Sequence, residues 1–274
     1  MKEVFEKVYG VIKTPEYVFK ELVHRVPAPF YKPDFNVDED LKENFRQLQT
    51  NGITVLDRII DAEYLELIRE EFDAVIENQK GSNPDSYHSI EPFLKGVCLL
   101  DLALERRILG LVAQYFRKPF GLSRTDALRL LPTTAGPHGS FQWHHDTRGK
   151  QLHAMILLTD VGADGQAMRY LNGSHRKVYS YHRGRQKPLF NKDVSELKIK
   201  NISYLVGRAG SVALFDSNGL HAGHRNNSYT RDSLTFCFAT WRHFFPVKVR
   251  RGAFDKLSRE QQGVLLYNPK LTII

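Results

Sequence analysis

The chain of 274 residues is 42% hydrophobic and 26% charged with a net charge of +8, a balance typical of a folded globular protein rather than a disordered or collagen-like chain. No apolar run approaches the roughly 20 residues that span a bilayer, and the first residues lack the apolar stretch of a signal peptide. A cytoplasmic location is therefore expected, with Cys98 and Cys237 as reduced thiols in apolar surroundings rather than a disulfide.

No linker divides the chain, so all 274 residues are expected to form one domain with four segments. Residues 1–25 place apolar side chains at helical spacing and predict helices, so residues 1–38 are expected to form an N-terminal helical extension, and residues 39–125 a helix-rich flank. Residues 126–245 switch to short strands separated by Gly, Asn, Asp and Pro, which is typical of sandwiches and jelly rolls. Residues 246–274 form a C-terminal segment with a last helix near residues 258–266.

Within the flank, a helix is expected to begin near Asp38, and Ile53–Leu56 is a short β run. The next helix is predicted from apolar residues that recur on one face at helical spacing. These residues are Leu65, Ile68, Phe72, Val75 and Ile76. Residues 99–116 are a further helical candidate, which Pro119 and Gly121 end.

The segment Trp143–Asp146 holds the first candidate metal ligands. Side chains alternate between faces in an extended segment, so His144 and Asp146 project the same way and His145 points away. His221 lies 75 residues beyond Asp146 and completes the set only if the fold brings it back. Two histidines and one carboxylate on one face of an octahedron is the pattern of non-haem Fe(II) oxygenases, which leave the other positions open.

Arg231 lies ten residues beyond His221. A planar guanidinium binds a carboxylate through two parallel hydrogen bonds, so Arg231 suits the far carboxylate of a 2-oxoglutarate cosubstrate. Ser233 lies two residues further along, on the same face of the predicted strand, and could add a hydroxyl to this contact.

Three further segments accompany the histidine motif in a set order. They are Gly165–His175, Gly210–Asp216 and Leu220–His221. Together with Trp143–Asp146, they resemble the phytanoyl-CoA dioxygenase family of Fe(II)- and 2-oxoglutarate-dependent oxygenases, over roughly residues 40–245. The resemblance implies a mainly β fold with flanking helices, built around a double-stranded β-helix (a jelly-roll, cupin-like core).

Carried over residue by residue, the resemblance makes His144, Asp146 and His221 the iron ligands and Arg231 the cosubstrate arginine. The family's spacing to the arginine favours His221 over its rival His224, which then serves as a substrate-facing or solvated loop residue. Halogenases of this superfamily replace the carboxylate by Ala or Gly, so the presence of Asp146 favours oxygen insertion over halogenation.

Two positions depart from the family pattern. Gly223 stands where related proteins often carry a small hydroxyl residue, so Ser233 is expected to take that role. Asn172 replaces the usual proline before Gly173, which alters a turn rather than the chemistry.

The expected function is a dioxygenase that uses Fe(II), 2-oxoglutarate and O2, hydroxylates a small and possibly anionic molecule, and releases succinate and CO2. One alternative is a non-catalytic jelly roll that binds a ligand. Another is a zinc hydrolase on the same three residues, since zinc accepts these ligands too. That hydrolase would leave Arg231 without a role.

Residues 176–200 carry most of the net positive charge, with eight Lys or Arg against two acidic residues. Such a segment could form a basic rim that attracts an anionic substrate or lipid head group, or it could be a solvated loop. The aromatic residues Tyr179, Tyr181 and Phe190 interleave with the charges and leave nucleic acid as a minor alternative, against which the family context argues.

Overall fold

The computed structural model describes residues 34–81, 84–94, 96–134, 139–146, 150–176, 201–226, 228–240 and 244–274. The helices predicted within residues 1–25 and all but Arg176 of the predicted basic segment lie outside these described residues.

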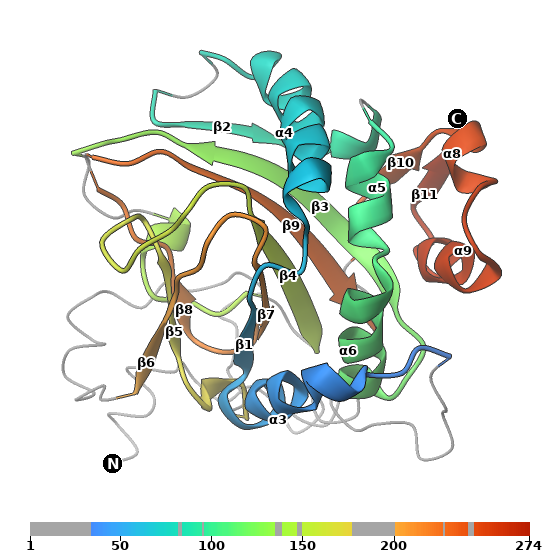
Figure 1. Cartoon of the computed structure of the whole chain (residues 1–274), viewed down its shortest axis with the longest axis horizontal. Helices are drawn as coiled ribbons and strands as arrows, with labels where there is room; N and C mark the ends of the chain where they lie inside the picture. The colour runs from blue at the N-terminus through green and yellow to red at the C-terminus, as the bar shows by residue number, and fades with distance from the viewer. Residues whose placement is uncertain are drawn as a thin grey trace, which may run out of the picture.

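A six-stranded antiparallel sheet forms the centre of the fold (Figure 1), with the strand order β1-β7-β4-β9-β3-β2. Its strands are β1 (Ile53–Leu56), β2 (Ser86–Ser89), β3 (Gly121–Leu130), β4 (Gln151–Leu157), β7 (Val212–Asp216) and β9 (Arg231–Ala239). A smaller antiparallel sheet has the order β6-β5-β8, with β5 (Met168–Leu171), β6 (Ile202–Leu205) and β8 (His221–Ala222). The predicted mainly β, jelly-roll fold class is confirmed.

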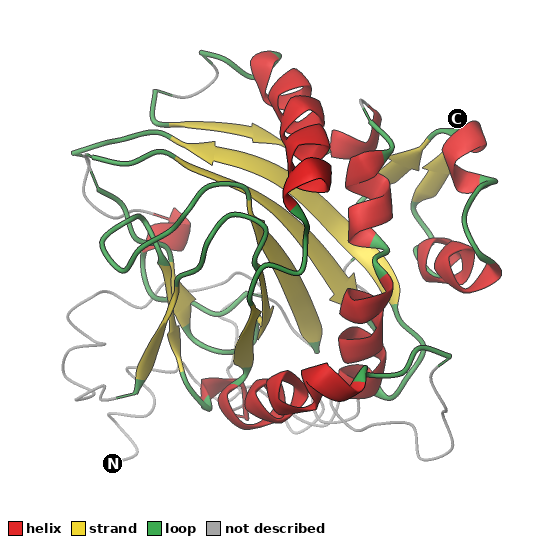
Figure 2. Cartoon of the chain, in the orientation of Figure 1, coloured by secondary structure: helices red, strands yellow, loops and turns green. Residues whose placement is uncertain are grey.

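Helices cover the large sheet on the side away from the small one (Figure 2). They are α3 (Lys42–Asn51), α4 (Ala62–Glu77), α5 (Cys98–Ala103) and α6 (Arg106–Phe116). The C-terminal segment adds α8 (Arg251–Phe254), α9 (Arg259–Leu266) and the parallel pair β10 (Val247–Val249) and β11 (Leu271–Ile273). Short 3-10 turns lie at Glu39–Leu41, Pro92–Leu94, Gly139–Phe141 and Ser174–Arg176. No helix in the described part of the chain has the length and apolar character to cross a bilayer.

Two predicted helices begin and bury their faces as the sequence indicates. The Asp61 side chain accepts a hydrogen bond from the backbone N–H of Tyr64 and caps α4, whose five predicted apolar residues are all buried. Ser258 caps α9 in a reciprocal capping box with Gln261, which confirms the predicted last helix.

The helix predicted over residues 99–116 is wrong in one respect, because it is two helices. Leu104 leaves the helical conformation, and Glu105 is extended with a φ of −61° and a ψ of 132°. The Glu105 carboxylate then accepts a hydrogen bond from the backbone N–H of Ile108 and starts α6. A side chain that caps a new helix therefore outweighs the continuous helical pattern.

The large sheet also extends beyond residues 126–245. Strand β1 confirms the short β run predicted at Ile53–Leu56, whereas β2 and the first half of β3 were not predicted within the helix-rich segment. β1 reaches the sheet by pairing with β7, about 160 residues away in the chain, from Ile53 opposite Phe215 to Leu56 opposite Val212. Pairing partners this distant leave no local signal in the sequence.

Strand β9 separates the hydrophobic core from a cavity between the two sheets. Leu234, Phe236 and Phe238 belong to the core that the sheet shares with the helices. Arg231 and Thr235 point to the other face and line the cavity. Because side chains alternate between the two faces of a strand, the register of β9 decides which residues can reach a ligand.

Replacing Phe236 with alanine is expected to destabilise the fold by ~3–5 kcal/mol, because the ring is fully buried and stands beside that of Phe93. Chemical denaturation measures the change in the free energy of unfolding. Leu67→Ala, on the exposed side of α4, is the control, and its effect should stay within ~0.5 kcal/mol. Equal effects of the two substitutions would contradict the assignment of this core.

Candidate metal centre

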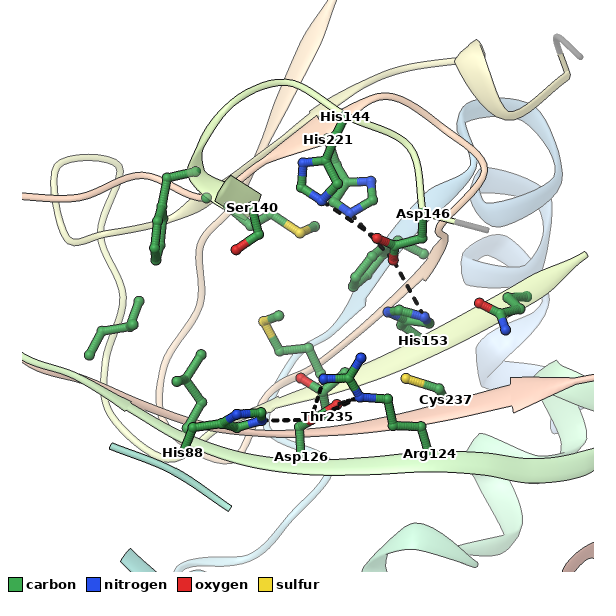
Figure 3. Close-up of a pocket in the computed structure, with 18 of the residues that line it drawn as sticks. His88, Arg124, Asp126, Ser140, His144, Asp146, His153, His221, Thr235 and Cys237 are labelled. Atoms are coloured by element: carbon green, nitrogen blue, oxygen red, sulfur yellow. Dashed lines mark hydrogen bonds and ion pairs between the residues drawn. The ribbon is translucent and has the colours of Figure 1, made fainter. Parts of the chain in front are cut away.

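His144 and His221 face each other across an antiparallel bridge. Each backbone N–H donates to the carbonyl oxygen of the other residue, at 2.9 and 2.8 Å. The backbone N–H of Asp146 donates to the carbonyl of Ser217 at 2.9 Å. Backbone hydrogen bonds between the two segments therefore hold the three candidate ligands close together. The possible ligand atoms of His144, Asp146 and His221 all lie within 4.8 Å of one another (Figure 3).

Both imidazole rings are oriented by backbone carbonyls. The Nδ1 atom of His144 is 2.7 Å from the carbonyl oxygen of Gln142, and that of His221 is 2.9 Å from the carbonyl oxygen of Gly219. A carbonyl oxygen only accepts, so each Nδ1 carries the proton and each Nε2 presents a lone pair. These Nε2 atoms lie 3.5 and 3.7 Å from the carboxylate of Asp146.

The protonation states also suit metal binding. Burial lowers the pKa of His221 to about 4, and the neighbouring His144 adds to this effect. Burial by itself would raise the pKa of Asp146, but the surrounding histidines, led by His221, outweigh it and lower the pKa. Burial likewise opposes the charged form of His144, whose pKa is nevertheless raised by its contact with Asp146. The site therefore offers an ionised carboxylate beside a neutral imidazole, the forms that ligate metals.

A buried turn positions His221. The carbonyl of Asp216 accepts hydrogen bonds from the backbone N–H of Gly219 at 2.9 Å and from the hydroxyl of Tyr170 at 2.8 Å. The Asp216 carboxylate accepts one from the Tyr115 hydroxyl at 2.7 Å. These bonds fix the turn whose Gly219 carbonyl orients the His221 ring.

Gly219→Ala is expected to weaken divalent-metal binding at least tenfold. A Cβ at this position would overlap the hydroxyl end of Tyr170, which is fully buried and hydrogen-bonded to the carbonyl of Asp216. The turn must then shift and carry the His221 ring with it, and small displacements of such rings are costly. Competition with a metal-sensitive dye measures the affinity. Gly252→Ala, where a Cβ would meet nothing within 4 Å, should leave it unchanged. Tight binding by Gly219→Ala would show that the turn does not position His221.

Arg231 lies in the same cavity as these three residues and is 4% exposed. Its Nη1 donates to the carbonyl oxygen of Gln166 at 2.6 Å, while its Nε has no hydrogen-bond partner among the described residues. Burial lowers the pKa of Arg231 to about 10, and the neighbouring Arg225 contributes to this shift. No acidic side chain in the described part of the chain forms an ion pair with it. A buried cation without a counter-ion is costly, so the site fits an anionic ligand.

Ser233 lies on the same face of β9 as Arg231, as expected, but its side chain does not reach the cavity surface. Its side chain is completely buried, and its hydroxyl has no hydrogen-bond partner among the described residues. Thr235, two residues further along β9, does line the cavity and was not singled out in the sequence.

The other histidines near the motifs differ in whether they line the cavity. His145 is buried and does not line the cavity, as expected from strand alternation, and His224 is outside both the ligand set and the cavity lining. The ring of His175 faces the backbone carbonyl of Gln49 at 3.3 Å, as a structural histidine would. His153, by contrast, lines the cavity with its Nε2 3.8 Å from Asp146.

The cavity holds about 670 Å³ and includes three polar residues that sequence reasoning missed, namely His88, Arg124 and Asp126. They come from β2 and β3, strands that no motif marked. The only available signal was alternation on β3, which puts Arg124 and Asp126 on the same face.

The family model for phytanoyl-CoA dioxygenase matches residues 48–231, which is more than half of the chain. The chain belongs to the phytanoyl-CoA dioxygenase family. The resemblance stated from the sequence motifs is thereby confirmed, and with it the enzyme class, since this is a family of Fe(II)- and 2-oxoglutarate-dependent oxygenases. The comparison with curated protein sequences gave no match.

Solved structures support the fold of this phytanoyl-CoA dioxygenase family member. The carbocyclase SnoK from nogalamycin biosynthesis is 20% identical, with a TM-score of 0.61 over 83% of this chain and 94% of SnoK. HygX from Streptomyces hygroscopicus, with nickel, 2-oxoglutarate and hygromycin B bound, is 17% identical, with a TM-score of 0.58 over 76% and 90%. EctD from S. alaskensis, with 2-oxoglutarate and 5-hydroxyectoine, is 18% identical, with a TM-score of 0.58 over 78% and 82%.

Proposed function

We propose that this protein is an Fe(II)- and 2-oxoglutarate-dependent dioxygenase that hydroxylates a small molecule. In this proposal His144, Asp146 and His221 hold the iron, and Arg231 binds the distal carboxylate of 2-oxoglutarate. The observation that carries the proposal is the buried Arg231, which has no acidic partner among the described residues and lies in the same cavity as the three candidate ligands.

The donor set fits ferrous iron, because imidazole and carboxylate ligands on one side leave other positions for a cosubstrate and oxygen. Iron with 2-oxoglutarate supplies the oxidising power for C–H oxidation when both are bound. The protein's own residues do the orienting. The carbonyls of Gln142 and Gly219 orient the rings of His144 and His221 so that their Nε2 atoms can bind the metal. The carbonyl of Gln166 accepts a hydrogen bond from one nitrogen of Arg231.

Ser233 is part of the proposal as a hydroxyl donor to the cosubstrate carboxylate, on the strand face of Arg231, although its side chain lies behind the cavity surface. Thr235 lines the cavity and offers the same group from the next position of that face. Comparison of Ser233→Ala with Thr235→Val in their affinity for 2-oxoglutarate separates the two.

The cavity volume of about 670 Å³ lies in the ordinary range for small-molecule sites. HygX and EctD were each solved with 2-oxoglutarate and a small organic molecule, which supports a small-molecule substrate here. An anionic substrate and a cytoplasmic location complete the proposal. Cys98 and Cys237 are free thiols, as a reducing compartment would require.

Two alternatives make different predictions. A zinc hydrolase on the same ligands gives the buried Arg231 no partner, and it would act without oxygen or 2-oxoglutarate. A non-catalytic jelly roll that only binds a small molecule would not need three metal-ligating side chains within 4.8 Å of one another in the same cavity as the buried Arg231. Both are less consistent with the cavity than the dioxygenase.

Anaerobic titration with Fe(II) and then 2-oxoglutarate tests the proposed function. A visible charge-transfer band that requires both additions is the expected result. Tight metal binding without any band, in a folded protein, would contradict the proposal and favour the zinc or non-catalytic alternative.

A further inference from the structure

Three polar side chains outside the candidate metal centre gather on the wall of the cavity. His88 comes from β2, and Arg124 and Asp126 come from β3, which pairs with β2. Figure 3 shows them together on the side of the cavity away from His144 and His221. We refer to these three residues as the β2–β3 cluster.

Asp126 is the centre of this cluster. Its carboxylate accepts hydrogen bonds from Nε and Nη2 of Arg124, at 3.0 and 2.8 Å. The Nε2 atom of His88 lies 2.7 Å from the same oxygen. Burial by itself would raise the pKa of Asp126, but His88 and Arg124 outweigh it and lower the pKa, so the carboxylate stays ionised.

The contacts hold Arg124 in place without using all its donors. The Nη1 atom donates to none of the described residues, and the guanidinium stands 5.3 Å from the ring centre of Phe245. The Arg124 side chain is 40% exposed and that of His88 is 41% exposed, whereas Asp126 is largely covered at 14%. An arginine fixed by a carboxylate and an aromatic ring, with donors directed to a cavity, is pre-organised to bind a ligand.

The chemistry of Arg124 limits what that ligand group can be. A guanidinium has five N–H donors and no acceptor, so its free positions bind only an acceptor. A carboxylate is preferred over a neutral carbonyl or hydroxyl, because it adds the attraction of opposite charges to the hydrogen bond and offers two oxygens to the planar fork of donors.

His153 lies between this cluster and the candidate metal centre (Figure 3). Its Nε2 is 3.8 Å from Asp146, and the charges of Arg124 and Asp126 act on it as well. A molecule bound to Arg124 would therefore extend past His153 toward Asp146. The cavity wall also includes the apolar residues Leu128, Met155, Met168 and Phe215.

We propose that the β2–β3 cluster binds a carboxylate of the primary substrate through Arg124 and so directs the apolar part of that substrate to the metal centre. The substrate class is a carboxylic acid with an apolar body. This inference rests on the proposed dioxygenase function, which makes the metal centre the place where the substrate reacts. The binding of a carboxylate to Arg124 can be measured separately. Arg124 acts here as a binding residue, with Asp126 and His88 as positioning residues.

Matched pairs of acids and their amides test the site. The probes are hexanoate against hexanamide, and 3-phenylpropionate against 3-phenylpropionamide. Their binding is measured by ligand-observed NMR on protein loaded with Zn(II) and saturating 2-oxoglutarate, which occupies Arg231. We expect each acid to bind at least tenfold more tightly than its amide and Arg124→Gln to remove this preference.

Two further variants show whether the preference depends on the charge and donor geometry of Arg124. Arg124→Lys keeps the charge but loses the fork of donors, so its preference should fall between those of the wild type and Arg124→Gln. Arg107→Gln removes an arginine of α6 that pairs with Asp40 outside the cavity, and it should keep the full preference. A wild-type protein without acid preference, or a preference that survives Arg124→Gln, would overturn the inference.

The two proposals fail in distinguishable ways. If the Fe(II) and 2-oxoglutarate band forms but acids bind no better than amides, the carboxylate site is wrong and the dioxygenase stands. If no band forms, the probes are titrated into metal-free protein. A preference that requires Arg124 and survives Arg231→Gln then supports the carboxylate site without the dioxygenase, and any other pattern contradicts it.

Discussion

Asp146→Ala is expected to lower the affinity for Fe(II) by at least ~100-fold and to abolish 2-oxoglutarate turnover, since mutation of groups that merely support a ligand already costs roughly 10–100-fold. Asp146 is the anionic member of the set, and its carboxylate lies 3.5 and 3.7 Å from the two imidazole Nε2 atoms. Its removal leaves two imidazoles, which do not balance the charge of a divalent cation. Anaerobic Fe(II) binding and succinate release measure the two effects.

The fold should survive this substitution, because the bridge between His144 and His221 is made by backbone groups. Circular dichroism and the melting temperature check this point. Asp255→Ala, an exposed position at the end of α8, removes the same charge and should leave binding and turnover unchanged. Wild-type Fe(II) affinity in Asp146→Ala would remove this residue from the proposed ligand set.

Arg231→Gln is expected to weaken 2-oxoglutarate binding by at least ~30-fold, or about 2 kcal/mol, because truncation of a buried hydrogen-bonded charge pair costs roughly 2–5 kcal/mol. The guanidinium lies in the cavity with one nitrogen anchored to the carbonyl of Gln166. A glutamine amide can approach a carboxylate but brings neither the charge nor the second parallel donor. Titration of the Fe(II)-loaded protein with 2-oxoglutarate under argon, followed through the charge-transfer band, measures the loss.

Fe(II) affinity should change little in this variant, since Arg231 is not among the residues whose ligand atoms cluster. This difference separates a cosubstrate residue from one that supports the whole site. Arg251→Gln, on the exposed surface of α8, is the matched control. An unchanged 2-oxoglutarate affinity, or an equal loss of iron and cosubstrate, would contradict the role proposed for Arg231.

The order of residues along β9 couples the stability of the fold to its chemistry. Phe236 and Phe238 face the helices, while Arg231 and Thr235 face the cavity. A slip of one residue in its pairing with β3 and β4 would exchange the two faces. The apolar residues of the strand therefore hold Arg231, the proposed cosubstrate residue, in register as well as stabilising the core.

Several features could be predicted from the sequence because their causes are local. The face of α4 and the capped start of α9 follow from helical spacing and capping residues. The candidate ligands could be named because His144 and Asp146 are two residues apart, and because the family's motifs lead to His221 and Arg231. Local pattern also misled once, where Glu105 starts a second helix within residues 99–116.

By itself, the sequence determined the fold class, the candidate metal ligands and the chemistry that those residue types support. Only the tertiary structure decided that Arg231 is buried with no acidic partner in the described part of the chain, that Ser233 lies behind the cavity surface, and that His153 stands beside Asp146. It also decided that His88, Arg124 and Asp126 meet on one wall. The physical reason is that burial, counter-ions and cavity walls arise from strands paired across the sheet, whose partners lie far apart in the chain.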